Sequence, residues 1–241
     1  MVDAHFAVPR LAEIYDGLDP VRRDLPAYLG MADRFEASSV LDVGCGTGTF
    51  ACLLARRGKR VVGVDPALAS LEVARRKPGA EKVRWLYGDA TTVGPLQVDL
   101  VTMTGNVAQV FVDDEDWAAT LDSVAAVLPR RGRLVFETRD PAKKAWENWT
   151  REQTYRKVDL TGIGEIETWV QVTKAELPLV SFRTTFVFGS DGAILTSDST
   201  LRFWSHKEIV DSLTDVGLGV QEVRDALDRP GLEKVYIAVR R

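Results

Sequence analysis

Hydrophobic and polar positions follow two different patterns along this chain. Between residues 39 and 137, short apolar runs alternate with segments in which apolar residues recur every three or four positions. The short runs predict buried β-strands, and the longer periodic segments predict amphipathic helices. This alternation indicates an α/β fold with a mostly parallel sheet, doubly wound, with helices on both faces. The predicted strands are 39–43, 60–65, 82–87, 98–103 and 132–137, and the predicted helices are 48–57, 67–76 and 114–128.

After Pro141 the period of the pattern shortens to two. Polar and apolar residues alternate in four segments, which are separated by turn signals such as Ser190-Asp191-Gly192. Period-two alternation predicts antiparallel strands, so we expect residues 141–203 to be an antiparallel β insertion after strand 132–137. The four predicted strands are 153–160, 165–174, 180–189 and 193–203.

Both ends of the chain complete this organisation. Ser205 and Glu208 predict the capped start of a helix over 205–216, with Gly217 ending it. Segments 219–227 and 234–240 predict a closing, hairpin-like pair that brings the main sheet to seven strands. Residues 10–36 predict helices with breaks at Pro20 and Pro26. We therefore expect one domain over 1–241, with an N-terminal helical cap at 1–36.

The turn after the first strand is rich in glycine. Gly44, Gly46 and Gly48 alternate between a buried strand and the start of a helix, where a backbone that permits positive φ and free N–H groups favour a nucleotide-like ligand. A dinucleotide fingerprint would place its third glycine where Thr49 stands, and Asp42 would repel a pyrophosphate but attract an ammonium group. The pattern disfavours an NAD-dependent dehydrogenase, and a glycine-rich turn without a ligand stays an alternative.

Two further acids follow the next two strands. Asp65 ends strand 60–65, where a carboxylate can accept from both hydroxyls of a ribose, although it can also cap the helix that begins at Pro66. Asp89 precedes Ala90, and this pair can read the exocyclic amine and a ring nitrogen of a purine. Alone, Gly-Asp-Ala would be an ordinary turn. All these residues fall at the carboxyl ends of parallel strands, where ligands bind in such sheets.

Taken together, these segments resemble the class I S-adenosylmethionine-dependent methyltransferases. The matching stretches are Val-Leu-Asp-Val-Gly-Cys-Gly-Thr-Gly at 40–48, Val-Val-Gly-Val-Asp at 61–65, Gly-Asp-Ala at 88–90, Val-Asp-Leu-Val-Thr-Met-Thr-Gly-Asn-Val at 98–107 and Leu-Pro-Arg-Arg-Gly-Arg-Leu-Val-Phe-Glu at 128–137. The resemblance implies a Rossmann-like fold, S-adenosylmethionine as cofactor, and an insertion that covers the active site as a substrate lid.

The resemblance also implies roles for single residues. The glycines would wrap the methionine moiety, Asp65 would hold the ribose, Asp89 and Ala90 would read the adenine, and the segment from Thr104 to Asn106 would line the methyl-transfer side. Tyr15, in the helical cap, would reach the cofactor's carboxylate or the substrate, or simply pack. The predicted cofactor-binding residues are Tyr15, Asp42, Gly44, Gly46, Gly48, Asp65, Pro66, Asp89, Ala90, Thr104 and Asn106.

Methyl transfer from a sulfonium is an in-line displacement, and only a hydroxyl or carbon nucleophile requires a general base. No side chain stands out as that base, and His5 and His206 are weak candidates. Glu137 and Arg139 end a strand beside the crevice, where they orient a substrate or form a salt-bridged strand end. An aromatic wall in the insertion would come from Trp146, Trp149 and Trp169, which equally supply core.

Composition limits the classes of molecule that the protein is expected to bind. A net charge of −4 and a pI near 5.4 disfavour nucleic acid and anionic membranes. There is no apolar stretch of about 20 residues and no cleavable signal pattern, and two cysteines with two histidines make a metal site improbable. We expect a cytoplasmic methyltransferase with a small-molecule acceptor, and the inserted β segment offers a surface for a homodimer. The alternatives are a catalytically silent, cofactor-binding regulatory protein and an enzyme acting on a protein or tRNA.

Overall fold

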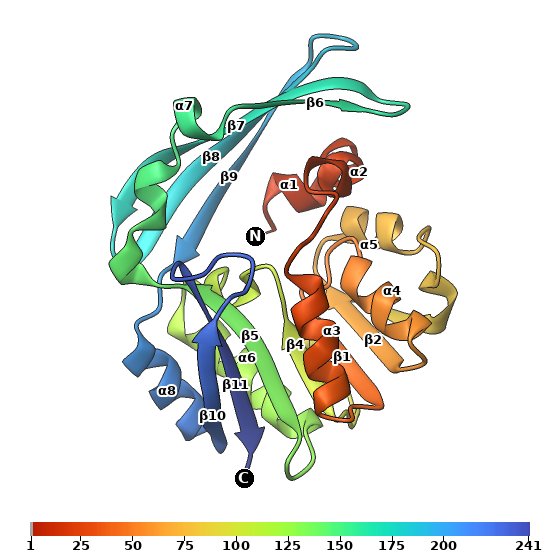
Figure 1. Ribbon diagram of the computed structural model, residues 1–241, viewed down its shortest axis with the longest axis vertical. Helices are drawn as coiled ribbons and strands as arrows, with labels where there is room; N and C mark the ends of the chain where they lie inside the picture. The colour runs from red at the N-terminus through yellow and green to blue at the C-terminus, as the bar shows by residue number, and fades with distance from the viewer. Residues whose placement is uncertain (1) are drawn as a thin grey trace.

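A seven-stranded sheet forms the centre of the computed structural model, which describes residues 2–241 (Figure 1). Its strand order is β10-β11-β5-β4-β1-β2-β3, with β3, β2, β1, β4 and β5 parallel and β11 antiparallel to both of its neighbours. The predicted fold class is confirmed. The strands are β1 Ser39–Val43, β2 Arg60–Asp65, β3 Val83–Tyr87, β4 Leu100–Met103, β5 Arg133–Arg139, β10 Leu218–Asp225 and β11 Glu233–Arg240.

Helices cover both faces of this sheet. On one face, α3 and α4 pack against a cluster that includes Val40, Val61 and Val135; on the other, α6 and α8 enclose a cluster with Leu41 and Phe136. Strands buried on both faces explain the continuous apolar runs of the sequence. The helices are α1 Ala4–Ala7, α2 Pro9–Leu18, α3 Leu25–Arg34, α4 Thr49–Arg56, α5 Leu68–Ala74, α6 Asp114–Val127, α7 Arg151–Thr154 and α8 His206–Asp215. Short 3₁₀ turns are η1 Ala80–Lys82, η2 Ala90–Thr92, η3 Val107–Gln109, η4 Pro141–Lys143 and η5 Ala145–Asn148.

A second, four-stranded antiparallel sheet, the insertion sheet, has the order β6-β7-β8-β9. Its strands are β6 Arg156–Leu160, β7 Gly164–Glu176, β8 Leu179–Phe188 and β9 Ile194–Arg202. Figure 1 shows it arching over the carboxyl edge of the main sheet, with α1 and α2 beneath it. One end of its inner face packs on α2, where Phe186 and Phe188 join Leu11 and Ile14 in one buried cluster. The N-terminal helices are therefore held between the two sheets.

Two local predictions were wrong. The strand expected from residue 153 begins at Arg156, because Thr150 caps a short helix, accepting a hydrogen bond from the Gln153 N–H (3.4 Å). Pro26 does not break a helix but lies in the first turn of α3, where its missing N–H has no partner to lose. The capping box of Ser205 and Glu208 and the helix end at Gly217, with φ 74°, are confirmed.

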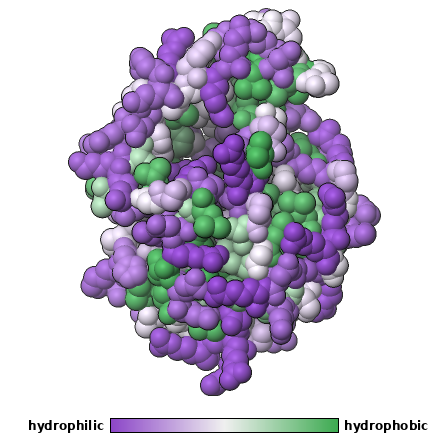
Figure 2. Space-filling model, in the orientation of Figure 1, coloured by the Kyte–Doolittle hydropathy of each residue, from purple (hydrophilic) through white to green (hydrophobic). Residues whose placement is uncertain are grey.

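The outer surface is mainly polar. Figure 2 shows hydrophilic residues over most of one face, hydrophobic side chains in scattered groups, and a recess below the insertion sheet. Within residues 2–241, none of the helices combines the length and apolar character that crossing a membrane requires.

Candidate cofactor and acceptor site

The glycine turn between β1 and α4 has the left-handed backbone that its sequence predicts. Gly44, Gly46 and Gly48 have φ of 68°, 52° and 74°. A Cβ on Gly48 would lie 2.7 Å from the Cβ of Ala74 and would collide with the Trp85 ring, whereas a Cβ on Gly46 would face open space. Gly48 is thus required by packing, and Gly46 leaves one side of the turn free for a ligand.

Asp65 joins this turn to the end of β2. Its Oδ2 accepts from the Gly46 N–H (2.7 Å), and its Oδ1 accepts from the Ala67 N–H (2.7 Å). Burial raises the pKa of this carboxyl, and the two backbone hydrogen bonds oppose the rise. A carboxylate offers about four lone-pair positions, so two remain for further donors such as ribose hydroxyls. The contact with the Ala67 N–H closes a turn before α5, but the N-cap residue of α5 is Ala67, so the alternative interpretation of Asp65 as the helix cap was wrong.

Asp42 lies on β1, immediately behind the glycine turn. Its side chain is 1% exposed, and its Oδ1 accepts from the hydroxyl of Thr102 on β4 (2.8 Å). Burial raises its pKa to about 7; the Thr102 hydrogen bond and the charge of Arg22 oppose the rise, and the charge of Asp65 adds to it. A carboxyl so placed favours an approaching cation.

The third predicted motif follows β3. Asp89 is exposed and caps η2, its Oδ1 accepting from the Thr91 N–H (2.8 Å) and the Thr91 hydroxyl (2.6 Å). Ala90 is buried at the start of η2, and Pro66 is exposed beside Asp65 on the neighbouring strand. An adenine contact at these residues stays a prediction.

The N-terminal cap closes on the glycine turn through Asp16 of α2. Its Oδ1 accepts from the hydroxyls of Thr47 (2.8 Å) and Thr49 (3.1 Å), and its Oδ2 lies 2.6 Å from Nζ of Lys77. Tyr15, the preceding residue, packs against His5 with ring centroids 5.2 Å apart. Burial raises its pKa, and the charge of Arg22 opposes the rise. Tyr15 therefore packs in the cap close to a cation, and the predicted contact of its hydroxyl with a ligand stays open.

The turn after β4 is held by a carboxylate from β5. Oε1 of Glu137 accepts from the Gly105 N–H and from the Asn106 N–H (2.9 Å). Glu137 is 3% exposed, and its Oε2 is buried without a hydrogen-bond partner. Burial raises its pKa to about 8. Thr104, half-buried, precedes this turn.

Asn106 points into a network of buried charges. It adopts a left-handed backbone with φ 63°, and its Nδ2 donates to Oε1 of Glu233 (3.2 Å) while its Oδ1 is buried without a partner. The same Glu233 oxygen accepts from Nη1 of Arg229 (2.8 Å) and lies 3.4 Å from Nε of Arg139. We call Asn106, Glu137, Arg139, Arg229 and Glu233 the buried charge cluster.

Gln109 connects the two ends of the insertion. Its Oε1 accepts from Nη1 of Arg139 (2.9 Å), the last residue of β5, and its Nε2 donates to the backbone carbonyl of Arg202 (3.0 Å), the last residue of β9. The Gln109 side chain is fully buried. It therefore bridges the points where the chain leaves the main sheet and where it returns.

The three tryptophans predicted to form an aromatic wall lie in two different places. Trp146 and Trp149 pack with Phe203 under the insertion sheet, and Arg139 lies over the Trp149 ring at 5.4 Å. Trp169 instead stacks on Tyr155 and Arg151, on the opposite side of β7 from buried Thr168.

Neither histidine lies among the cofactor motifs. His5 is enclosed by Tyr15 and Phe186, and burial lowers its pKa to about 4. His206 is exposed at the start of α8, with its Nδ1 3.1 Å from the Tyr236 hydroxyl.

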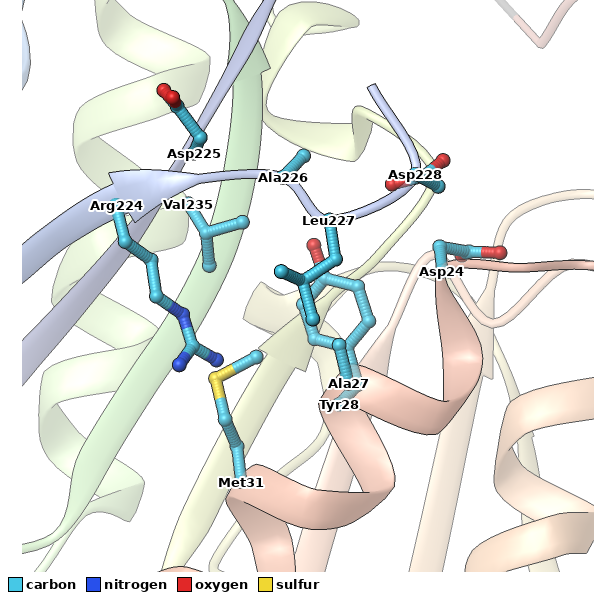
Figure 3. A pocket seen from close by; sticks show the side chains of 10 residues that line it. All are labelled: Asp24, Ala27, Tyr28, Met31, Arg224, Asp225, Ala226, Leu227, Asp228 and Val235. Atoms are coloured by element: carbon cyan, nitrogen blue, oxygen red, sulfur yellow. The ribbon is translucent and has the colours of Figure 1, made fainter. Parts of the chain in front are cut away.

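Two cavities lie apart from these motifs. The cleft in Figure 3 lies between α3, which contributes Tyr28 and Met31, and the end of β10, which Leu227 follows; its volume of about 10 Å³ holds about one water molecule. A larger cavity, of about 280 Å³, lies between Thr138, Asp140, His206 and Tyr236. Arg139, a member of the buried charge cluster, is among the residues that line this cavity, whereas Glu137 is not.

Several residues of the site carried no sequence signal. Asp16, Arg22, Gln109 and Glu233 lie outside the recognised motifs, and only the folded chain brings them to the carboxyl edge of the sheet. The charge of Arg22, in the connection between α2 and α3, affects Tyr15 and Asp42, and Arg22 itself is paired with Asp24 through Nε (3.0 Å) and Nη2 (2.7 Å).

Known proteins share this architecture. The profile of a family described as "Methyltransferase domain" matches residues 40–132. Cypemycin N-terminal methyltransferase from a Streptomyces species is 32% identical over 120 residues, which are 49% of this chain and 49% of that protein, so the chain matches about half of this curated relative. Among solved structures, the CcbJ methyltransferase of Streptomyces caelestis superposes with a TM-score of 0.79 at 20% identity, covering 95% of this chain and 96% of that one. The sugar N-methyltransferase KedS8 of a Streptoalloteichus species gives a TM-score of 0.77 at 18% identity, covering 100% of this chain and 96% of its own.

The motifs, the strand order and these matches agree. Residues 40–132 match the methyltransferase-domain family, and the chain as a whole has the fold of solved methyltransferases.

Proposed function

We propose that the protein transfers a methyl group from S-adenosylmethionine to a small-molecule acceptor bound beneath the insertion sheet. The observation that carries the proposal is the glycine turn, with Gly46 facing open space and the carboxylates of Asp42 and Asp65 beside it at one edge of the sheet. In the proposed complex, Asp65 uses its remaining lone pairs for the ribose hydroxyls, and Asp42 faces the ammonium of the methionine moiety.

The remaining cofactor contacts follow from position. Asp89 and Ala90, with Pro66 opposite, flank the proposed adenine site, and Arg22 and Tyr15 lie on the side proposed for the methionine carboxylate. Arg22 is an addition to the residues expected from sequence. The turn from Thr104 to Asn106 then faces the methyl group, which places the acceptor between β4, β5 and the insertion sheet.

A small-molecule acceptor is supported by the enclosure of this region. Trp146, Trp149 and Phe203 close it from above, and the N-terminal helices close it from the side. KedS8, the structural neighbour described as a sugar N-methyltransferase, has the same fold. Within the site, the chain's own residues bind both substrates, align the acceptor atom with the methyl–sulfur bond, and exclude water.

Calorimetric titration with S-adenosylmethionine and S-adenosylhomocysteine tests the proposal. We expect both to bind, and Asp65→Ala to weaken binding by about 1.5–3 kcal/mol, the scale of lost charged hydrogen bonds, or roughly 10- to 150-fold. Asp211→Ala, which removes an exposed partner of Lys207 on α8, is the matched control and should leave affinity unchanged. If neither compound binds at millimolar concentration, the proposal fails. Binding without transfer to any acceptor would favour the regulatory alternative.

A further inference from the structure

Glu137 differs from its charged neighbours Glu233 and Asp24, because no cation among residues 2–241 is paired with it. Arg22 is held by both oxygens of Asp24, and Arg139 and Arg229 are directed at Glu233. These three arginines, with Glu233 and Asp24, are the charged groups whose fields reach Glu137. Each cation is already taken, so Glu137 lacks a positive partner.

Two buried acceptor oxygens are also unsatisfied at this point. Oε2 of Glu137 and Oδ1 of Asn106 have no hydrogen-bond partner, although their residues are bonded to each other through the Asn106 N–H and Oε1 of Glu137. The orientation of the Asn106 amide follows from its other contact, since an oxygen in place of Nδ2 would face the carboxylate of Glu233. When Glu137 is ionised, both oxygens are acceptors, and two unpaired buried acceptors on bonded residues favour a ligand with several N–H donors.

We propose that the acceptor is a primary or secondary amine that enters as its ammonium ion, donates to Glu137 Oε2 and Asn106 Oδ1, and passes a proton to Glu137 before methyl transfer. This inference rests on the proposed function and names its substrate class. A hydroxyl has a single donor and no charge, so it would satisfy one of the two oxygens and leave the carboxylate without its cation.

The pKa values of Glu137 and of the possible acceptors also favour an amine over an alcohol. An alkylammonium has a pKa near that of lysine, about 10.4, and burial raises the pKa of Glu137 to about 8. Proton transfer from ammonium to Glu137 is then unfavourable by only a few hundredfold, against about a millionfold for an ordinary glutamate near pKa 4.3. A hydroxyl as weakly acidic as water, with a pKa of about 15.7, would face a barrier of roughly ten-millionfold or more.

The reaction then balances without any further reagent. The ammonium N–H breaks and its proton goes to Oε2 of Glu137, which leaves a lone pair on the nitrogen. That pair forms the N–CH₃ bond while the C–S bond breaks and its electrons go to sulfur, giving neutral S-adenosylhomocysteine and a methylated ammonium ion. At pH 7 Glu137 keeps this proton when the products leave and releases it to water as the next ammonium ion binds.

Access to Glu137 requires a local shift, because the residue is enclosed in the ligand-free chain. Arg22 and Asp24 lie before α3, and Arg229 lies in the β10–β11 loop, so the nearby charges sit on irregular segments. Arg22 has φ 34°, a strained value for a residue with a Cβ. We expect these segments to move when an acceptor binds.

The test uses matched pairs of acceptors with wild-type protein and methyl-labelled S-adenosylmethionine. Hexylamine and hexanol, glucosamine and glucose, and benzylamine and benzyl alcohol differ in the nucleophile alone. We expect label only in amines. Label in an alcohol overturns the amine inference and leaves the proposed function standing. Label in no compound, although S-adenosylhomocysteine binds, overturns the amine inference and favours the regulatory alternative. Failure to bind S-adenosylhomocysteine removes both.

The role of Glu137 is tested with Glu137→Gln. We expect kcat for the best amine to fall by 10²- to 10⁴-fold, the range for proton transfer by a positioned side chain, and the acidic limb of the pH profile to disappear, while affinity for S-adenosylhomocysteine stays within threefold. Glu222→Gln, which removes a surface partner of Arg34, is the control. A variant that keeps its activity overturns the assignment.

A measurement on the wild type covers the case in which the variant does not fold. Titrating the amine into protein saturated with S-adenosylhomocysteine, in two buffers of different ionisation enthalpy at pH 7, reports proton release. We expect release as Glu137 ionises against the ammonium, and its absence overturns the pairing.

Discussion

Glu137 should make the stability of the ligand-free protein fall as the pH rises. Burial raises the pKa of this carboxyl from 4.5 to about 8, so between these values the folded chain holds a proton that the unfolded chain has lost. The unfolded state binds fewer protons in this window, and the free energy of unfolding therefore decreases with pH. The stabilisation is fully present below pH 4.5 and is lost as the pH rises through about 8.

The magnitude follows from the same values. One proton of difference changes the free energy of unfolding by up to about 1.4 kcal/mol per pH unit, or about 3 kcal/mol between pH 5.5 and 7.5. Asp42 acts in the same direction up to its pKa of about 7. Comparing wild type with Glu137→Gln cancels the Asp42 contribution, because that residue is present in both proteins.

Urea unfolding at pH 5.5, 6.5, 7.5 and 8.5 provides the assay. We expect wild type to lose up to about 3 kcal/mol relative to Glu137→Gln between pH 5.5 and 7.5, and the difference to level off above pH 8. The absolute stability of the variant is not diagnostic, because the buried amide replaces one unpaired group with another. Glu222→Gln should show no such slope, since the Arg34 hydrogen bond lowers the pKa of Glu222 and keeps it ionised throughout this window. Parallel pH profiles for wild type and Glu137→Gln would refute the reasoning.

Three further outcomes are expected. Gly46→Ala should cost about 1–2 kcal/mol of stability, because its backbone is left-handed, and should weaken S-adenosylhomocysteine binding. Gly48→Ala adds a collision with Ala74 and Trp85 and should cost about 2–5 kcal/mol. Melting curves and calorimetric binding measurements together distinguish the glycine that faces the ligand from the glycine that packing requires. Asp16→Ala should release the N-terminal cap from Thr47, Thr49 and Lys77, which limited proteolysis would detect as earlier cleavage before residue 25; unchanged cleavage would contradict the role of Asp16. Gln109→Ala removes the hydrogen bond to the Arg202 carbonyl and one of the two partners of Arg139, and should cost about 1–3 kcal/mol in urea unfolding, with Gln153→Ala on exposed α7 as control.

The cofactor half of the site was readable from the sequence because its determinants are local. Each strand-end motif contains its own glycines and acid within a few residues, and parallel strands bring their carboxyl ends to one edge whatever the details of packing. The same logic predicted the seven strands and the insertion. Glycine at 48 is required by Trp85 and Ala74, yet its effect on the backbone is visible from the turn alone.

The acceptor half was not readable for the opposite reason. Glu137 was noted at a strand end, but its isolation depends on Glu233 and Asp24 having taken every nearby arginine, and those residues lie far apart in the chain. Trp169 lies on β7, whereas Trp146 lies in η5 and Trp149 directly follows it, and the sequence does not show which face of β7 carries Trp169. Long-range pairing, and not residue type, decides these positions.

Gln109 has a consequence for how this protein can diverge. Its hydrogen bonds to Arg139, where the insertion begins, and to Arg202, where it ends, hold the two ends of the insertion together. Each doubling of the length of such a loop adds only about 0.6 kcal/mol to the free energy of loop closure, provided that its two ends stay linked. Strands β6 to β9 can therefore be shortened, extended or exchanged for those of a relative while the glycine turn and Asp65 keep their places. The cofactor-binding part of the chain can thus stay constant while the insertion sheet is exchanged. A chimera that retains Gln109, Arg139 and Arg202 is the starting point for changing which molecule the protein modifies.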